Sequence, residues 1–176
     1  RLAAPTAVSG LAFNRGDQFP DTFAQDIFVP EPGANVVAQF RRQLDGISVT
    51  AEHLTYPDEQ WGQREFMASS DERFRPVDVK FGPDGALYII DMYRGIIQEQ
   101  SFLTDELREQ IFERNLDSPL GLGRIWRVVH TASSIRRQPP ALADTRQQFA
   151  ALSHANGWHR DGAQRLLIQS GEAVEA

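Results

Sequence analysis

The sequence has no cysteine, a single lysine and no long apolar run. Of its 18 basic side chains, 17 belong to arginine, and Lys80 is the only lysine. Without cysteine, the chain itself cannot hold disulfides, iron–sulfur clusters, thiolate zinc sites or covalently attached haem c. A membrane helix needs roughly 18 consecutive apolar residues, and no stretch approaches that length. We therefore expect no membrane span in this chain.

The charge balance is acidic, with a formal net charge of -6 and a pI near 5.2. A general nucleic-acid binder usually shows a basic face, so we expect no nucleic-acid partner. The apolar fraction of 41% is ordinary for a globular protein, and 176 residues can bury a core in one or two domains. The chain begins with RLAAPTAVSG, which has neither an initiator methionine nor a signal-peptide pattern. We interpret it as a processed product or a piece of a longer protein.

Two segments within the first 130 residues follow the same plan. The first reads SGLAFNRGDQF, DIFVPEPG and ANVVAQFRR, and the second reads RPVDVKFGPDG, ALYIIDMYRG and GLGRIWRVVH. In each, an apolar strand leads to a Gly/Asp turn, a second strand follows, and a third comes after a loop. Between them, ISVTAEHLTY carries β-branched residues at Ile47, Val49 and Thr50, which predicts a fourth strand.

Four antiparallel strands joined by hairpins are the plan of a β-propeller blade. The fold class predicted for the chain is mainly β with α. Residues 1-130 are predicted to be the C-terminal blades of a partial β-propeller, about two four-stranded antiparallel blades at about 7–56 and 73–130. The second blade lacks its outer strand. Isolated blades would expose their sheet edges, which favours a C-terminal slice of a larger propeller. A self-contained β-sandwich with the same strands is the alternative.

The character of the chain changes after His130. Residues 131-143 are polar and contain prolines, which predicts a linker. In 144-176, DTRQQFAALSH and GWHRDGAQRLLIQSG predict a HEAT-like helical hairpin, with a turn at HANG and a stop at Gly171. Such a hairpin cannot bury its apolar faces alone, so we interpret it as the first unit of a helical repeat array. Its expected apolar positions are Phe149 and Leu152 in the first helix and Trp158, Leu166 and Leu167 in the second.

A helical insertion is expected at 96-121, between two strands of the second segment. Thr104 is a suitable N-cap, and Asp105 and Glu106 would favour the helix dipole in the first turn. Long insertions in a compact sheet are often lids or docking elements. Residues spaced at four give this helix one apolar stripe: Leu103, Leu107 and Ile111.

The stretch FGPDGALYIIDMYRG has two ends of different character. FGPDG (81–85) has tight-turn chemistry, with Gly85 free to adopt positive φ, and we interpret it as scaffold. DMYRG ends the following strand, on the face where we also expect EPGAN (31–35) and ERFRP (72–76). Loops on a rigid scaffold are where binding residues concentrate. We therefore place the candidate site where these three loops converge, at the mouth of the central channel that the blades of a propeller surround.

The candidate ligand residues come from these loops. Arg75 and Arg94 offer bidentate donors to carboxylates or phosphates. Glu31, Asp91 and Tyr93 could hydrogen-bond a polyol or help hold an oxygen-ligated cation, whose identity stays unknown. A structural Arg75–Asp91 pair between neighbouring strands, with Tyr93 as packing, is the alternative. The histidines are interpreted as surface or packing residues: His53, His130, His154 and His159.

Longer stretches resemble a known family. FNRGDQFPDTFAQDIFVPEPGANVV and SSDERFRPVDVKFGPDGALYIIDMYRGII resemble the propeller of bacterial quinoprotein sugar (glucose/sorbosone) dehydrogenases, especially the multidomain membrane-bound dehydrogenase type. In that type, HEAT-like helices and commonly a c-type cytochrome domain follow the propeller. HANGWHRDGAQRLLIQSG is similar to the first helical repeat, so the resemblance covers about residues 7–170.

The resemblance implies oxidation of a sugar or alcohol, with hydride passing to pyrroloquinoline quinone (PQQ), calcium polarising the cofactor, and electrons passing to a cytochrome domain. It also implies a periplasmic or other extracytoplasmic location. Arg73-Phe74-Arg75 matches the Arg-aromatic-Arg stretch that contacts the quinone in the relatives, so Arg73 and Arg75 are the implied cofactor-binding residues.

The sequence departs from the family pattern at two points. Where the relatives have a cofactor-contacting lysine, this chain has Glu31-Pro32-Gly33, and an acidic residue would repel a trianionic quinone. The relatives' catalytic histidine lies in an earlier blade, so we expect no catalytic residue in this chain and no oxidation of sugars by the chain alone. The alternative function is a non-catalytic propeller–HEAT scaffold that binds glycans or protein partners.

Overall fold

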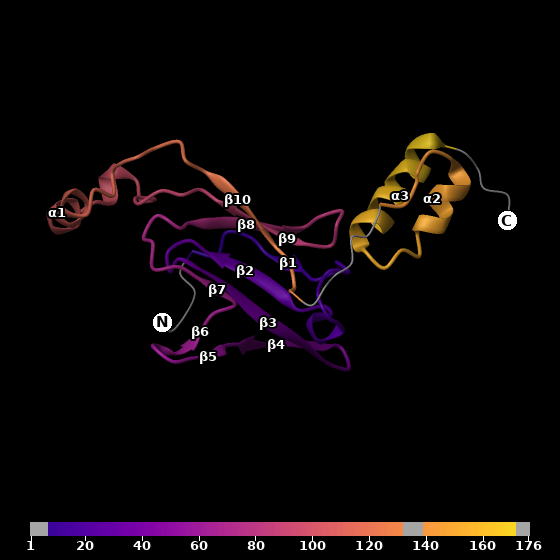
Figure 1. Ribbon diagram of the computed structural model, residues 1–176, viewed down its shortest axis with the longest axis horizontal. Coiled ribbons are helices and arrows are strands. Elements are labelled where there is room, and N and C mark those ends of the chain that lie inside the picture. The colour runs from indigo at the N-terminus through magenta and orange to yellow at the C-terminus, as the bar shows by residue number, and fades with distance from the viewer. Residues whose placement is uncertain (1–6, 132–138, 172–176) are drawn as a thin grey trace. The chain divides into compact units, whose positions relative to one another are not determined.

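The computed structural model describes residues 7–131 and 139–171 (Figure 1). The chain divides into two compact units. We call the first the sheet unit; it comprises Arg1–Ala12, Asp26–Lys80 and Ile89–Trp126. We call the second the helical unit; it comprises Phe13–Gln25, Phe81–Tyr88 and Arg127–Ala176.

The larger sheet is a meander built from the first predicted segment. Its strands are β1 (Ala12–Phe13), β2 (Ile27–Glu31), β3 (Val36–Asp45) and β4 (Ser48–Leu54), in the order β1-β2-β3-β4, and a fifth strand, β7 (Met67–Ala68), also pairs with β3. β2 and β3 are antiparallel, with Glu31 opposite Val36, and β3 and β4 are antiparallel, with Asp45 opposite Ser48. The four strands predicted for this segment are therefore present in the predicted order.

The second segment forms a three-stranded sheet. Its strands are β8 (Pro76–Phe81), β9 (Leu87–Asp91) and β10 (Arg124–Val128), in the order β10-β9-β8. A separate hairpin of β5 (Tyr56–Asp58) and β6 (Gly62–Arg64) lies between the two segments, and the sequence did not predict it. The chain is mainly antiparallel β with helices, and the described residues form no closed barrel.

Alternation along the strands decides which side chains the sheet unit buries. Phe28, Val37, Val79 and Ile89 are fully buried. Because side chains two residues apart in a strand point to the same face, the alternation that buries Ile89 also buries Asp91 at the end of β9. Asp91, the first residue of the candidate-site loop DMYRG, is therefore part of the buried face of the sheet.

The helix expected in the insertion is present. α1 (Asp105–Glu113) begins after Thr104, whose side chain accepts a hydrogen bond from the backbone N–H of Leu107 at 3.2 Å. The apolar stripe faces inward at its C-terminal end, where Ile111 is 5% exposed. The described residues also form two short 3₁₀ helices, η1 (Asp21–Phe23) and η2 (Gln100–Phe102).

The predicted helical hairpin is also present, as α2 (Thr145–Ala151) and α3 (Gly157–Ser170), which pack side by side (Figure 1). The side chains of Asp144 and Asn156 accept hydrogen bonds from the N–H groups of Gln147 and Trp158 and so cap the helices. Gly171, with φ of 63°, ends α3 in the left-handed conformation.

The large apolar side chains of this hairpin are not the ones it buries. Of the expected apolar positions, Phe149, Leu152 and Trp158 have exposed fractions of 39%, 37% and 53%. The helical positions that are buried carry small side chains or a histidine: Ala151, Gly157, His159 and Ala163. Apolar periodicity identifies a helix face, but it does not tell whether another element covers that face.

Several broader predictions stay predictions. Closure into a propeller, the HEAT-like assignment and the domain boundaries at 131-143 and 144-176 are not decided by these elements, and residues 132–138 of the expected linker lie outside the described residues. Within the described part of the chain, no helix combines the length and the hydropathy that crossing a bilayer requires.

Candidate functional site

Arg75 links the loops that were expected to form the site. It lies directly before β8, and its guanidinium donates from Nη1 to the carbonyl oxygen of Pro32 (2.7 Å), from Nε to that of Arg94 (3.0 Å) and from Nη2 to that of Gly95 (2.8 Å). Desolvation by burial lowers the pKa of Arg75, and the nearby Glu72 carboxylate opposes this shift. The predicted meeting of the loops is thus made by one side chain, through backbone carbonyl groups.

Asp91 is the most buried charged group of the site, with 1% of its surface exposed. Its Oδ1 accepts from the backbone N–H groups of Arg75 (2.8 Å) and Tyr93 (2.9 Å). Its Oδ2 accepts from Nε of Arg124 (2.8 Å) and Nε1 of Trp126 (3.2 Å). Two carboxylate oxygens offer about four lone-pair sites, so these four donors leave Asp91 no capacity for a ligand.

This arrangement corrects the ion pair that was considered for Asp91. Its charged partner is Arg124, from β10, whereas Arg75 contacts it only through the backbone N–H. The sequence pattern held a usable signal, because Arg124 and Trp126 alternate along β10 and therefore lie on one face of that strand.

Tyr93 has an uncommon backbone conformation, with φ of 48°. For a residue other than glycine, positive φ is strained, and such strain persists only when surrounding contacts hold it. Here the Tyr93 N–H donates to Asp91, and the Tyr93 hydroxyl donates to Oδ2 of Asp71 at 2.9 Å. This last hydrogen bond raises the pKa of Tyr93. Burial raises the pKa of Asp71, but hydrogen bonds from the Arg73 N–H and the Tyr93 hydroxyl outweigh it, so that pKa is lowered.

Arg73 contacts the part of the insertion that follows α1 in the chain. Its Nη2 donates to the carbonyl oxygens of Asn115 (2.7 Å) and Ser118 (3.1 Å). The neighbouring Glu72 forms an ion pair with Arg114 at 2.6 Å. Both contacts hold the end of the insertion near the start of β8, so Arg73 already has backbone partners.

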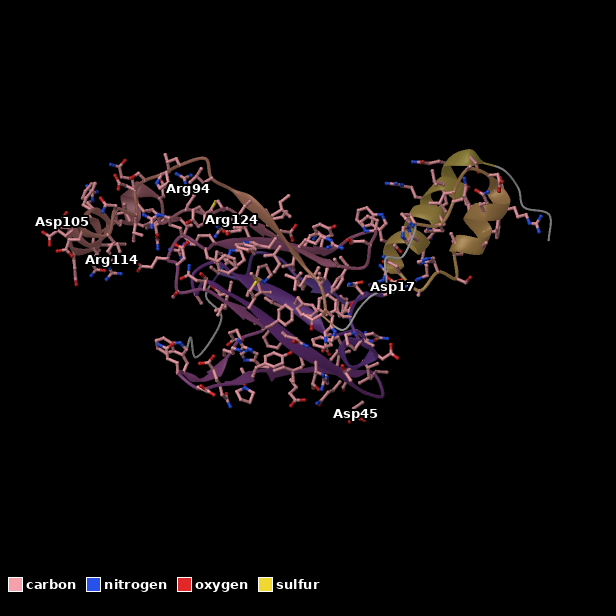
Figure 2. All side chains as sticks on the ribbon, viewed as in Figure 1. Asp17, Asp45, Arg94, Asp105, Arg114 and Arg124 are labelled. Atoms are coloured by element: carbon pink, nitrogen blue, oxygen red, sulfur yellow. The ribbon has the colours of Figure 1, made fainter. Side chains whose placement is uncertain are left out.

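The remaining predicted residues have opposite environments. Glu31 ends β2 with 3% of its surface exposed, and both carboxylate oxygens accept from the N–H of Ala7, at 2.9 and 3.0 Å. Arg94, labelled in Figure 2, is exposed, and its guanidinium makes no hydrogen bond to any residue in the described ranges. Their roles as ligand residues stay predictions.

A cation or a quinone finds few ready partners here. Within residues 7–131 and 139–171, no group of three or more histidine, aspartate or glutamate side chains could hold a metal ion. A tricarboxylated quinone needs available N–H donors, but Arg73 and Arg75 donate to carbonyl oxygens, and Asp91 and Glu31 add negative charge. Arg73 and Arg75, the implied quinone contacts, therefore do not fit PQQ without rearrangement.

A second polar network lies in the helical unit, and the sequence did not predict it. The turn FGPDG is scaffold of a particular kind: Nδ2 of Asn156 donates to the carbonyl oxygens of Gly82 (3.0 Å) and Pro83 (3.1 Å). Nε2 of His159 is 2.8 Å from the Pro83 oxygen, so this nitrogen carries the proton, because a carbonyl only accepts. The turn therefore receives the N-terminal end of α3.

Comparison with known proteins gives a family and one solved structure. A family model described as "Domain of unknown function (DUF7133)" matches residues 1–132. A search of curated proteins found no match. A solved structure named "glucose dehydrogenase" is similar to part of the chain, with 27% identity and a TM-score of 0.30, over 48% of this chain and 21% of that one. A likeness at this TM-score supports no conclusion about a shared activity.

Proposed function

The chain belongs to the DUF7133 family, and we propose that it acts as a non-catalytic scaffold within a longer protein, holding loops that bind a glycan or a protein partner. The observation that carries this proposal is the Arg75 guanidinium, which donates to the carbonyl oxygens of Pro32, Arg94 and Gly95. A side chain with these contacts fixes the path of the backbone.

The energetics of Arg75 favour this structural role. A carboxylate ligand that took over its N–H donors would leave carbonyl oxygens of the loops without partners, and each such group costs about 1–3 kcal/mol when buried. The ligand would therefore have to offset that cost before it gained affinity. Arg73 adds to the argument, because it holds the insertion by two further carbonyl oxygens, those of Asn115 and Ser118.

The second candidate is a quinoprotein-type dehydrogenase that oxidises a sugar or an alcohol, with this chain as one wall of the site. It is favoured by the Arg73-Phe74-Arg75 motif and by the exposed guanidinium of Arg94, which makes no hydrogen bond to any of the residues that the structure describes. The N–H donors of Arg73 and Arg75 would have to leave their carbonyl partners before they could contact PQQ. PQQ, calcium, a cytochrome domain outside this chain and a periplasmic location belong to this candidate alone.

Arg75→Ala in the intact protein separates the two functions. If Arg75 holds the loops, its removal should lower the free energy of unfolding by about 2–3 kcal/mol, the scale of charge-assisted hydrogen bonds. Arg75→Lys should lose nearly as much, since a single ammonium cannot reproduce the planar fork. Denaturant unfolding measures both. Arg108→Ala is the matched control, because Arg108 is an exposed arginine of α1 in the same unit.

The dehydrogenase candidate predicts the opposite result. PQQ added to the intact protein should support dye reduction with a sugar or alcohol, and Arg75→Ala should lose PQQ affinity while keeping its stability. That combination would overturn the scaffold proposal. A stability loss together with no PQQ-dependent activity in the wild type would remove the dehydrogenase.

A further inference from the structure

Arg124 is held in place but keeps one edge of its guanidinium unused. Its Nε donates to Oδ2 of the buried Asp91 at 2.8 Å. Its guanidinium carbon lies 3.9 Å from the centre of the Tyr93 ring and 4.6 Å from that of the Trp126 ring. The two terminal nitrogens donate to no residue within the described ranges, and 39% of the side chain is exposed. We call Tyr93, Arg124 and Trp126 the Arg124 platform.

The platform is held by contacts within the protein itself. Cation–π contact with two rings and a hydrogen bond to a buried carboxylate restrict the rotamers of a side chain that otherwise loses much entropy on binding. Tyr93, which supplies one ring, is itself held at positive φ by Asp91 and Asp71. Strained residues of this kind gather at binding sites.

The charged groups near the platform are of both signs. Asp91 has four donors and is almost fully buried. Arg73 and Arg124 both act on Asp71 and lower its pKa, so the two guanidinium groups share one local field. Arg94, which follows Tyr93 in the chain, adds an exposed positive charge. The carboxylates of Asp71 and Asp91 lie in the same region, so an anion would be held by the unused N–H donors of Arg124 and not by a general excess of positive charge.

We propose that the Arg124 platform binds the carboxylate of a sugar acid. The two free terminal nitrogens form the planar fork that accepts a carboxylate through two parallel hydrogen bonds. The Tyr93 oxygen, having donated its proton to Asp71, can still accept from a ligand hydroxyl. Trp126 is 37% exposed and offers apolar ring surface to the C–H groups of a sugar. This site uses Arg124 and not Arg75, so it stands independently of the scaffold proposal.

Isothermal titration of the intact protein with glucuronate tests the site, with glucose as the neutral partner of the same shape. Glucuronate should bind at least tenfold more tightly than glucose. Arg124→Lys keeps a positive charge beside Asp91 but lacks the fork, and it should weaken glucuronate binding by tenfold or more. Arg108→Gln removes an exposed arginine of the same unit and should leave the affinity unchanged.

Each result of the titration either supports or overturns the proposed carboxylate site. Equal binding of glucose and glucuronate, or unchanged affinity in Arg124→Lys, would overturn the proposal, and so would acetate that binds as tightly as glucuronate. If Arg124→Lys does not fold, the arginine side-chain ¹⁵N resonances of the wild type decide instead. A shift of the Arg124 signals on addition of glucuronate, but not of glucose, supports the site, and the absence of that shift refutes it.

Discussion

The sheet unit and the helical unit both hold a turn or loop by donating side-chain N–H groups to backbone carbonyl oxygens, but they use different chemistry. In the sheet unit the donor is the half-buried guanidinium of Arg75. In the helical unit the donor is the neutral amide of Asn156, which is 1% exposed. The charged guanidinium of Arg75 is tolerated because it is only half-buried and remains near water. At the fully buried position of Asn156 a neutral donor is favoured, because burying a charge costs free energy.

This difference shows why the residue types alone misdirect attention. Arginines and aspartates at loop edges predict a binding site, yet most of those side chains are occupied by the protein's own backbone. The turn FGPDG carries no such signal, yet its backbone carbonyl groups accept hydrogen bonds from Asn156 and His159. Proline cannot donate from its backbone nitrogen, so a turn built around Pro83 presents acceptors more readily than donors. Contact to carbonyl groups is the common principle, and side-chain charge is not.

The largest effect is expected from Asp91, the centre of the charged network. Asp91→Ala leaves the N–H groups of Arg75 and Tyr93, and the side chains of Arg124 and Trp126, without their acceptor. Loss of one partner from a buried ionic network costs about 3–5 kcal/mol. Denaturant unfolding of the intact protein should show this loss. Asp45→Ala removes an exposed aspartate at the end of β3 and should change stability by less than about 0.5 kcal/mol (Figure 2).

Asp91→Asn tests whether charge or hydrogen bonding matters in this network. The amide oxygen can still accept, but its NH₂ group would face donors, so we expect an intermediate loss between that of Asp45→Ala and that of Asp91→Ala. If Asp91→Ala unfolds no more easily than the Asp45 variant, the network does not stabilise the sheet unit, and the comparison between the two units fails.

Much of the fold could be predicted because it depends on local patterns. Alternating apolar residues identified β2, β3, β8 and β9, and the same alternation, continued past Ile89, indicates that Asp91 points inward. The partners of Arg75 could not be predicted, because they are carbonyl groups whose positions depend on the path of three loops. Arg124 was missed for a related reason: its role arises from pairing with a strand more than thirty residues away.

The next largest effect is expected from Asn156, which has two tasks. Its Oδ1 caps α3 by accepting from the Trp158 N–H, and its Nδ2 donates to the oxygens of Gly82 and Pro83. Asn156→Ala should cost about 2–3 kcal/mol, because loss of an N-cap costs about 1 kcal/mol and each lost hydrogen bond a similar amount. Hydrogen exchange of the α3 amides measures the loss locally.

Asn156→Asp separates the two tasks. A carboxylate keeps the cap but faces two carbonyl oxygens without a proton to donate. If the contact with the turn matters, this variant should lose most of what Asn156→Ala loses. If it keeps wild-type protection, only the cap stabilises α3, and the parallel with Arg75 is lost.

In the helical hairpin, too, the boundaries of the helices could be predicted from the sequence but the burial of their side chains could not. The turn at HANG and the stop at Gly171 marked its boundaries in the sequence, since such signals depend on neighbouring residues. The exposure of Phe149 and Trp158 could not be read from the sequence, because burial depends on which element lies opposite. Local chemistry therefore predicted where the helices begin and end, but not which of their residues are covered.

The smallest effect is expected from the bidentate pair of Arg15 and Asp161 in the helical unit, in which Nη1 and Nη2 donate at 2.8 and 2.7 Å. Both side chains are about half exposed, at 49% and 57%, so water screens the pair and a double-mutant cycle at pH 7 should give about 0.2–1 kcal/mol. The hydrogen bond from Arg15 lowers the pKa of Asp161 below its ordinary 3.8, and burial opposes this shift. A carboxylate with a lowered folded-state pKa adds stability above its unfolded value and loses it as pH falls through the folded value. The coupling should therefore be lost as the pH falls below the ordinary value of 3.8 and the Asp161 carboxylate becomes protonated, and it should weaken in high salt. A coupling that persists undiminished in acid, or that exceeds the loss in Asn156→Ala, would show that charge dominates in the helical unit as well.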